Sequence, residues 1–261
     1  MPTAFALELR PQRPQPAPRY LGQYAHGLFY HLLERLSPNL SAEVHAAKTV
    51  PFTLEARGTG EVVTLRVALL QDDLFAPLLQ AALSQSLEGL QLGSEAYTIT
   101  RVLMTPEGHP RAMRLSWDAL VHAPPTRTLE LDFLSPTLFT TSGLGGKRHY
   151  TPLPEPRLVL GSLLRVHQAF SPDPYLEPSV AYFKQMFEDL TAVLECRIQT
   201  HSFPAGKQAL TGFVGQVTLG LLERRLELEA LLGRMGALAP FCGVGTKTPY
   251  GMGQVAVREL A

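Results

Sequence analysis

Apolar residues recur with the period of an α-helix in several segments of this chain. Between residues 21 and 36 they stand at i, i+3, i+4 and i+7, which predicts a long amphipathic helix. Ser37-Pro38 ends that helix, and the proline opens a second, short helix that reaches His45. A third helix is predicted over 72–87, where leucines share one face.

Alternating apolar and polar positions predict the strands between these helices. The first half of the chain has predicted strands at 5–9, 51–54, 61–70 and 97–103. The second half has predicted strands at 129–133, 193–200, 212–222 and 254–260, and helices at 156–170, 178–190 and 223–239. Both halves read β-α-β-β-α-β, the second with one extra helix.

This repeated order predicts an α+β protein made of two tandem ferredoxin-like units. We place the first unit at residues 1–122 and the second at 127–261, with the proline-rich segment His122-Ala-Pro-Pro-Thr126 between them. The sheet of such a unit has one open face, which RNA binders of the RRM type use.

Composition narrows the classes of function. The chain has 23 Lys and Arg against 23 Asp and Glu, a balance that argues against a general coat for duplex DNA but permits one local basic groove. The two cysteines, Cys196 and Cys242, form no zinc motif or disulfide framework. The start of the chain lacks the pattern of a signal peptide, and no apolar run approaches the ~18 residues of a membrane span. We therefore expect a cytoplasmic protein without contact to a membrane.

A glycine-rich loop lies between the last predicted helix and the last predicted strand. Its glycines surround a lysine and a threonine: Gly243, Gly245, Lys247, Thr248, Gly251 and Gly253. Glycine lets a backbone approach a ligand closely and point N–H groups at an anion. The ATP and NAD loops run from strand to helix instead, and Thr246 stands where a P-loop has glycine. The loop therefore predicts a phosphate site of another kind, with a plain turn as the alternative.

Four stretches, in order along the chain, resemble the CRISPR-associated repeat-processing endoribonucleases (Cas family six of the RAMP superfamily). The loop 243–253 resembles the family's C-terminal signature. Gly27-Leu-Phe-Tyr30 and Val44-His45, followed by 51–54, resemble its N-terminal motifs. Residues 134–139 with 154–159, and Thr211-Gly-Phe-Val-Gly215, resemble motifs of its second unit.

The resemblance implies a metal-independent endoribonuclease that cuts CRISPR precursor RNA within its repeats and yields guide RNAs. Attack by the ribose 2′-OH would leave 2′,3′-cyclic phosphate and 5′-OH ends. No cofactor is expected, and the implied partners are precursor and processed repeat RNA. Other Cas proteins of an effector complex and a second copy of the chain are further partners that the sequence leaves open. The alternatives are a non-catalytic RNA-binding subunit of an effector complex and, more distantly, a small-molecule phosphate-binding protein.

The same resemblance implies three catalytic residues. His45 matches the family's catalytic position, and histidine suits a general base or acid because its pKa lies near the working pH. Lys48 is expected one helical turn further on, where it would stabilise the charge of the phosphorane. Tyr30 would orient the ribose, although a solvent-facing tyrosine is an alternative. His26 is a second candidate, because relatives differ in which helix supplies the histidine.

Some family members carry the lysine a few residues later, where this chain has Val50 or Pro51. The role of Lys48 is therefore open at this stage. Lys147 and Arg148 follow a glycine-rich segment and predict a basic hairpin tip that would grip RNA, or else a solvated loop. Together with the glycine loop and its Lys247, they are the expected RNA-binding residues.

Overall fold

The computed structural model describes residues 1–17, 21–83, 90–142, 147–172, 180–205 and 208–258. The chain forms two compact units: unit 1 is Met1–Leu115 with Pro249–Gly251, and unit 2 is Ser116–Thr248 with Met252–Ala261. Residues 116–122, which the sequence analysis placed in the first unit, belong to unit 2, where helix α4 (Trp117–Val121) contacts the last helix, α7 (Leu226–Cys242). The units are ferredoxin-like, as predicted, and are described separately below.

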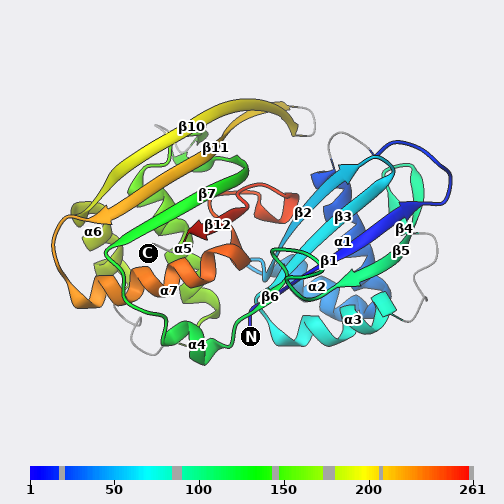
Figure 1. Cartoon of the computed structure of the whole chain (residues 1–261), viewed down its shortest axis with the longest axis horizontal. Helices are drawn as coiled ribbons and strands as arrows, with labels where there is room; N and C mark the ends of the chain where they lie inside the picture. The colour runs from blue at the N-terminus through cyan, green and yellow to red at the C-terminus, as the bar shows by residue number, and fades with distance from the viewer. Residues whose placement is uncertain (18–20, 84–89, 143–146, 173–179, 206–207, 259–261) are drawn as a thin grey trace. The chain divides into compact units, whose positions relative to one another are not determined.

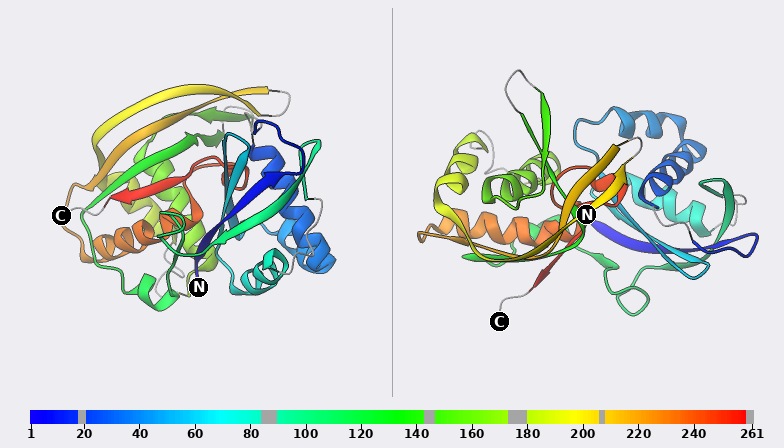
Figure 2. Two further views of the ribbon diagram at one scale, coloured as in Figure 1. Left: turned by 45° about the vertical axis from the view of Figure 1, so that its right-hand side comes forward. Right: turned by 90° about the horizontal axis from the view of Figure 1, so that it is seen from above.

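Unit 1 contains, in chain order, β1 (Thr3–Pro11), α1 (Gly22–Leu36), α2 (Pro38–Ala46), β2 (Phe52–Thr59), β3 (Val62–Leu69), the 3-10 helix η1 (Asp72–Leu74), α3 (Phe75–Leu83), β4 (Leu90–Leu92), β5 (Glu95–Leu103) and β6 (Met113–Arg114). Its antiparallel sheet has the order β2-β3-β1-β5-β4, and β6 pairs with β1 (Figure 1). The helices cover one face of this sheet (Figure 2). Strands β4 and β6 were not predicted, since each is too short to show an alternating pattern.

Helix α1 carries the apolar stripe that the sequence predicts, and its buried positions include Leu28, Phe29 and Leu32. The helix ends at Leu36 because Ser37 adopts an extended conformation. The Oγ of Ser37 then accepts a hydrogen bond from the Leu40 N–H (3.3 Å) and caps α2. A side-chain cap of this kind stabilises a helix by about 1 kcal/mol. The sharp turn at Ser37 brings α2, and with it His45, back against α1.

Part of the unit 1 sheet face opposite the helices is covered around a buried arginine, whereas Arg57 on the same face is exposed, so the face is open only in part. Arg66 alternates with core residues along β3, so its side chain points away from the helices. It lies opposite Glu55 on β2, and its Nε donates to the carbonyl of Arg111 (3.1 Å). Arg111 in turn pairs with Glu55. Because Arg66 is only 1% exposed, RNA cannot stack on the sheet at this point as it does on an RRM.

Unit 2 contains, after α4, β7 (Thr128–Thr137), β8 (Phe139–Ser142), β9 (Arg148–Thr151), α5 (Pro156–Phe170), α6 (Val180–Leu190), β10 (Thr191–Ala205), β11 (Gln208–Leu221), α7, the 3-10 helix η3 (Thr248–Tyr250) and β12 (Val255–Arg258). The sheet order is β10-β11-β7-β12, and β8 pairs with β9 in a separate hairpin. Helices α5, α6 and α7 lie on one face of the sheet (Figure 2).

The β10–β11 hairpin is longer than predicted. Its register continues to the pair Ala205–Gln208, well past the predicted end at Thr200. Besides backbone pairing, a small apolar cluster holds the extension: Leu210 packs with Leu138 and Met252, and Phe203 lies against them. Within the described part of the chain, no helix is both long and apolar enough to cross a membrane.

Candidate active site

Two histidines and two tyrosines of unit 1 form one cluster of rings. His26 and Tyr30 lie one turn apart on α1, with ring centroids 4.9 Å apart. Tyr30 meets His45 of α2 at 5.3 Å, and His26 meets Tyr250 of the glycine loop at 3.9 Å, edge to face. We call these four residues the histidine–tyrosine cluster. It unites both predicted catalytic residues of this region, His45 and Tyr30, with the secondary candidate His26.

The apolar core of unit 1 supports the cluster from one side. Phe52, which is fully buried, lies 5.7 Å from the Tyr30 ring and 6.4 Å from the His26 ring, centroid to centroid. Phe29 in turn packs on Phe52 at 4.2 Å. Interiors are close-packed, so these contacts restrict the orientations of Tyr30 and His26. The half-buried Tyr30 is thus not the solvent-facing tyrosine of the alternative interpretation.

Tyr250 reaches the cluster because the loop tip packs directly on the start of α1. A Cβ atom added at Gly22 would lie only 2.0 Å from the Tyr250 carbonyl oxygen. A glycine is therefore required at that position, for close approach of two backbones. Tyr250 was not predicted as a site residue; its place between Pro249 and Gly251 in the glycine signature was the one available signal.

Burial and neighbouring charge set the protonation of the cluster. Burial, and secondarily the positive charge of His45, lower the pKa of His26 below 6.5. The His26 Nδ1 is buried, with no hydrogen-bond partner among the described residues. Burial, and secondarily Tyr250, raise the pKa of Tyr30 above 10. At neutral pH the cluster therefore offers a neutral imidazole that accepts a proton and a phenol that donates a hydrogen bond.

His45 is exposed in the last turn of α2, as predicted. The expected position of Lys48 is wrong, however. Helix α2 ends at Ala46 and Ala47 is extended, so Lys48 lies in an exposed bend and not one helical turn from His45. Among the described residues, no three His, Cys, Asp or Glu side chains are grouped as metal ligands.

The first half of the glycine loop uses its N–H groups inside unit 2. The Gly245 N–H donates to the Ser162 Oγ (2.8 Å), and the Thr246 N–H donates to the Leu138 carbonyl (3.0 Å). Gly253 closes the loop, and its carbonyl accepts from the Val244 N–H (2.8 Å). The prediction that these N–H groups point at an anion is therefore wrong, because they are bonded within the protein. Here the glycines let the loop fold on itself.

Lys247 stands out in this loop because it has a positive φ of 61° without being a glycine. A left-handed conformation costs a side-chain-bearing residue about 1–2 kcal/mol. Such conformations are concentrated at functional sites. Gly243, Gly245, Gly251 and Gly253 all have positive φ as well, so left-handed conformations occur on both sides of Lys247 and Thr248.

The predicted basic hairpin is present in unit 2. Strands β8 and β9 pair with Ser142 opposite Arg148, and both Lys147 and Arg148 are exposed. The glycine-rich residues 143–146 lie outside the described residues. The exposed basic end of the hairpin is available for a polyanion.

Comparison with known proteins identifies relatives over the whole chain. Residues 131–255 match the family model described as CRISPR-associated endoribonuclease Cas6. The CRISPR-associated endoribonuclease Cas6 of Mycobacterium tuberculosis is 34% identical over 145 residues, which are 53% of this chain and 41% of that protein. A Cas6 product complex is 44% identical, with a TM-score of 0.92 over 99% of this chain and 100% of that chain. A structure of Thermus thermophilus Cas6 is also 44% identical, with a TM-score of 0.78 over 99% of this chain and 98% of that one.

Proposed function

Because this chain belongs to the Cas6 family of CRISPR-associated endoribonucleases, we propose that it cuts CRISPR precursor RNA within the repeats to give guide RNAs. The observation that carries this proposal is the histidine–tyrosine cluster, which places His26, Tyr30 and His45 in contact at one site of unit 1. Related Cas6 proteins have been solved as product and substrate-mimic complexes, which supports repeat RNA as the ligand.

The proposed chemistry is transfer of the phosphodiester to its own ribose. The 2′-oxygen forms a bond to phosphorus, and the bond to the 5′-oxygen of the next nucleotide breaks. One group takes the 2′-OH proton, and another protonates the leaving oxygen. The products are a 2′,3′-cyclic phosphate and a 5′-OH. This reaction needs proton transfer and charge stabilisation, both of which side chains can supply.

The two histidines suit the two proton transfers. The lowered pKa of His26 keeps its imidazole neutral and favours it as the base, which leaves the acid to His45. Tyr30 lies between them and remains a phenol, so its hydroxyl can orient the ribose. Lys48 lies beyond the end of α2, so the helix does not align it with His45. Its long, flexible side chain would bring the ammonium group to the phosphorane and stabilise the negative charge there.

We assign RNA binding to basic residues of unit 2. Lys247 and Thr248 of the glycine loop, and Lys147 and Arg148 of the β8–β9 hairpin, are the side chains that would contact the RNA backbone. The loop glycines would act by holding Lys247 in its left-handed conformation. Replacing Lys247 with alanine should therefore weaken RNA binding more than it slows cleavage of bound RNA.

The decisive experiment is single-turnover cleavage of repeat RNA in EDTA by wild type and His45→Ala. We expect the variant to lose at least about 100-fold in rate, the usual contribution of a general acid or base, and to keep its affinity for RNA. His31→Ala is the matched control, because His31 is an exposed histidine on α1 next to Tyr30. It should cleave at the wild-type rate.

The upstream fragment should end in a 2′,3′-cyclic phosphate, which resists a phosphatase until acid opens the ring. The downstream fragment should begin with a 5′-OH, which a polynucleotide kinase phosphorylates directly. Unimpaired cutting by His45→Ala would refute the assignment of His45 and move the acid role elsewhere. Intact RNA at saturating wild-type protein would refute the nuclease and favour a non-catalytic RNA-binding subunit.

A further inference from the structure

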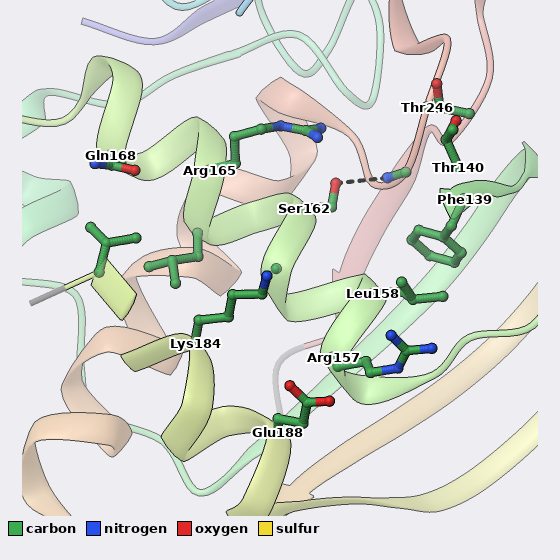
Figure 3. A pocket seen from close by; sticks show the side chains of 14 residues that line it. Phe139, Thr140, Arg157, Leu158, Ser162, Arg165, Gln168, Lys184, Glu188 and Thr246 are labelled. Atoms are coloured by element: carbon green, nitrogen blue, oxygen red, sulfur yellow. Dashed lines mark hydrogen bonds between the residues drawn. The ribbon is translucent and has the colours of Figure 1, made fainter. Parts of the chain in front are cut away.

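A cleft in unit 2, lined by both polar and apolar side chains, has no role in the site described above. It has a volume of about 420 Å³ and lies between α5 and α6, bordered by β8 and by the start of the glycine loop (Figure 3). The volume falls in the range of small-ligand sites, which are about 300–1,000 Å³. Its walls, however, carry charged and hydroxyl side chains where such sites are usually apolar.

Positive charge exceeds negative charge along this cleft. Arg157, Arg165 and Lys184 line it, against the single carboxylate of Glu188. The Arg157 Nε is already paired with Glu155 (2.8 Å). Arg165 and Lys184 have no hydrogen-bond or ion-pair partner among the residues that the structure describes. Among the described residues, the cleft therefore holds two cationic side chains without an ion-pair partner, in a protein whose formal net charge is zero.

A hydrogen bond joins the glycine loop to α5 at the wall of the cleft. The buried Ser162 on α5 accepts the Gly245 N–H through its Oγ (2.8 Å), which ties the loop to the helix (Figure 3). Thr246, the next residue, lines the cleft, and Lys247 follows it. Thr140 lines the cleft from β8, whose partner strand begins with Arg148. The cleft thus adjoins both groups of basic residues proposed to bind RNA.

From these observations we infer that the cleft between α5 and α6 binds phosphate groups of the RNA, held by Arg165 and Lys184. Arginine and lysine are the side chains that bind phosphate through charge-assisted hydrogen bonds. The Thr140 and Thr246 hydroxyls add donors at the rim of the cleft. The inference rests on the proposed function, because it takes the RNA from the glycine loop into this cleft.

The test compares wild type with Arg165→Ala/Lys184→Ala, by fluorescence anisotropy with labelled repeat RNA over a series of salt concentrations. Each lost phosphate contact reduces the salt slope by about 0.7 for single-stranded RNA. Two contacts should therefore reduce the slope by about 1.4 and weaken binding about tenfold at 0.15 M salt. The rate at saturating protein should be unchanged, because neither residue belongs to the histidine–tyrosine cluster.

Arg224→Ala/Arg225→Ala is the charge-matched control. It removes the same two charges from unit 2, but each of these arginines already faces a carboxylate, Glu229 and Glu223 respectively. The control should keep the wild-type salt slope. Conversely, Glu188→Gln removes the one carboxylate of the cleft and should tighten RNA binding.

The outcomes separate this inference from the proposed function. Wild-type affinity and slope in Arg165→Ala/Lys184→Ala, with cleavage intact, would overturn the cleft site and leave the nuclease standing. An equal loss in the Arg224→Ala/Arg225→Ala control would also overturn it, since net charge alone would then explain the effect. If inorganic phosphate raises the melting temperature of wild type but not of the cleft variant, while RNA affinity stays equal, the cleft binds a small anion and the RNA assignment is wrong.

Discussion

Replacing Gly22 with alanine should disable the site without removing any reactive side chain. The new Cβ would lie 2.0 Å from the Tyr250 carbonyl oxygen, whereas Cβ atoms in proteins stay at least 3.0 Å from other heavy atoms. One backbone must therefore move by at least 1.0 Å. No rotamer change can relieve the contact, because both partners are main chain.

The moving part carries Tyr250, whose ring is 3.9 Å from that of His26. A displacement of ~1 Å near reacting groups can slow catalysis by about 100-fold. We therefore expect single-turnover cleavage by Gly22→Ala to fall by roughly 10–100-fold. In addition, the pKa of His26, followed by NMR titration, should rise toward its ordinary value of 6.5 as the ring loses its cover.

Gly27→Ala is the matched control on the same helix, because a Cβ at Gly27 would meet no atom within 4 Å. It should cleave normally and gain roughly 1 kcal/mol in the free energy of unfolding from helix propensity. Propensity favours alanine at both positions, so a loss at Gly22 alone isolates the contact with Tyr250. A Gly22→Ala protein that is folded, cleaves at the wild-type rate and keeps its His26 pKa would refute the reasoning.

Three further predictions concern stability and reactivity. Because the folded-state pKa of His26 is lowered, the unfolded chain binds its proton first, so the free energy of unfolding should fall as pH drops through 6.5 and level off below the folded pKa. His26→Gln should make this step smaller in urea unfolding curves, and the remaining step should come from His109, whose pKa burial also lowers; a step of the same size in the variant would contradict the reasoning. Burial raises the pKa of Cys242 to about 12, so a thiol reagent should modify only the exposed Cys196 in the native protein. In guanidinium the same reagent should modify both cysteines. Two rapidly reacting thiols in the native protein would contradict this prediction. Gly253→Ala should lower the free energy of unfolding by roughly 3 kcal/mol, because strain at φ 63° adds to a contact of the new Cβ with a backbone oxygen at 2.0 Å. Gly60→Ala is the control, since Gly60 has φ 60° and open space around it, and it should lose only ~1 kcal/mol. Equal losses in the two variants would show that φ alone matters.

The fold was predictable because its signals are local. The stripe on α1 and the alternation in β3 follow directly from periods of 3.6 and 2 residues. The repeat of one element order in two halves then defined the architecture. The length of the β10–β11 hairpin was not predictable, because the apolar contacts of its outer part join Phe203 and Leu210 to residues far away in the sequence and leave no alternating pattern.

The candidate site was only partly predictable. His45, Tyr30 and His26 were identifiable from their motifs and their positions on helices, whereas Tyr250 was not, because its contact joins segments far apart in the sequence. The position of Lys48 was predicted wrongly because α2 ends where Ala47 becomes extended, and alanine at that position is not a residue that signals a helix end. The loop glycines were visible in the sequence, but the hydrogen bonds from the Gly245 N–H to Ser162 and from the Thr246 N–H to Leu138 were not.

The assignment of Pro249–Gly251 to unit 1 has a consequence for how the protein is synthesised. Tyr30 and His26 leave the ribosome early, but Tyr250 is synthesised some 220 residues after Tyr30. At about 5–20 residues per second, that interval lasts roughly 10–45 s. During this time unit 1 can fold with its cluster still incomplete, and most of unit 2 is synthesised before the last ring arrives. The histidine–tyrosine cluster is therefore complete only after most of unit 2 has been synthesised.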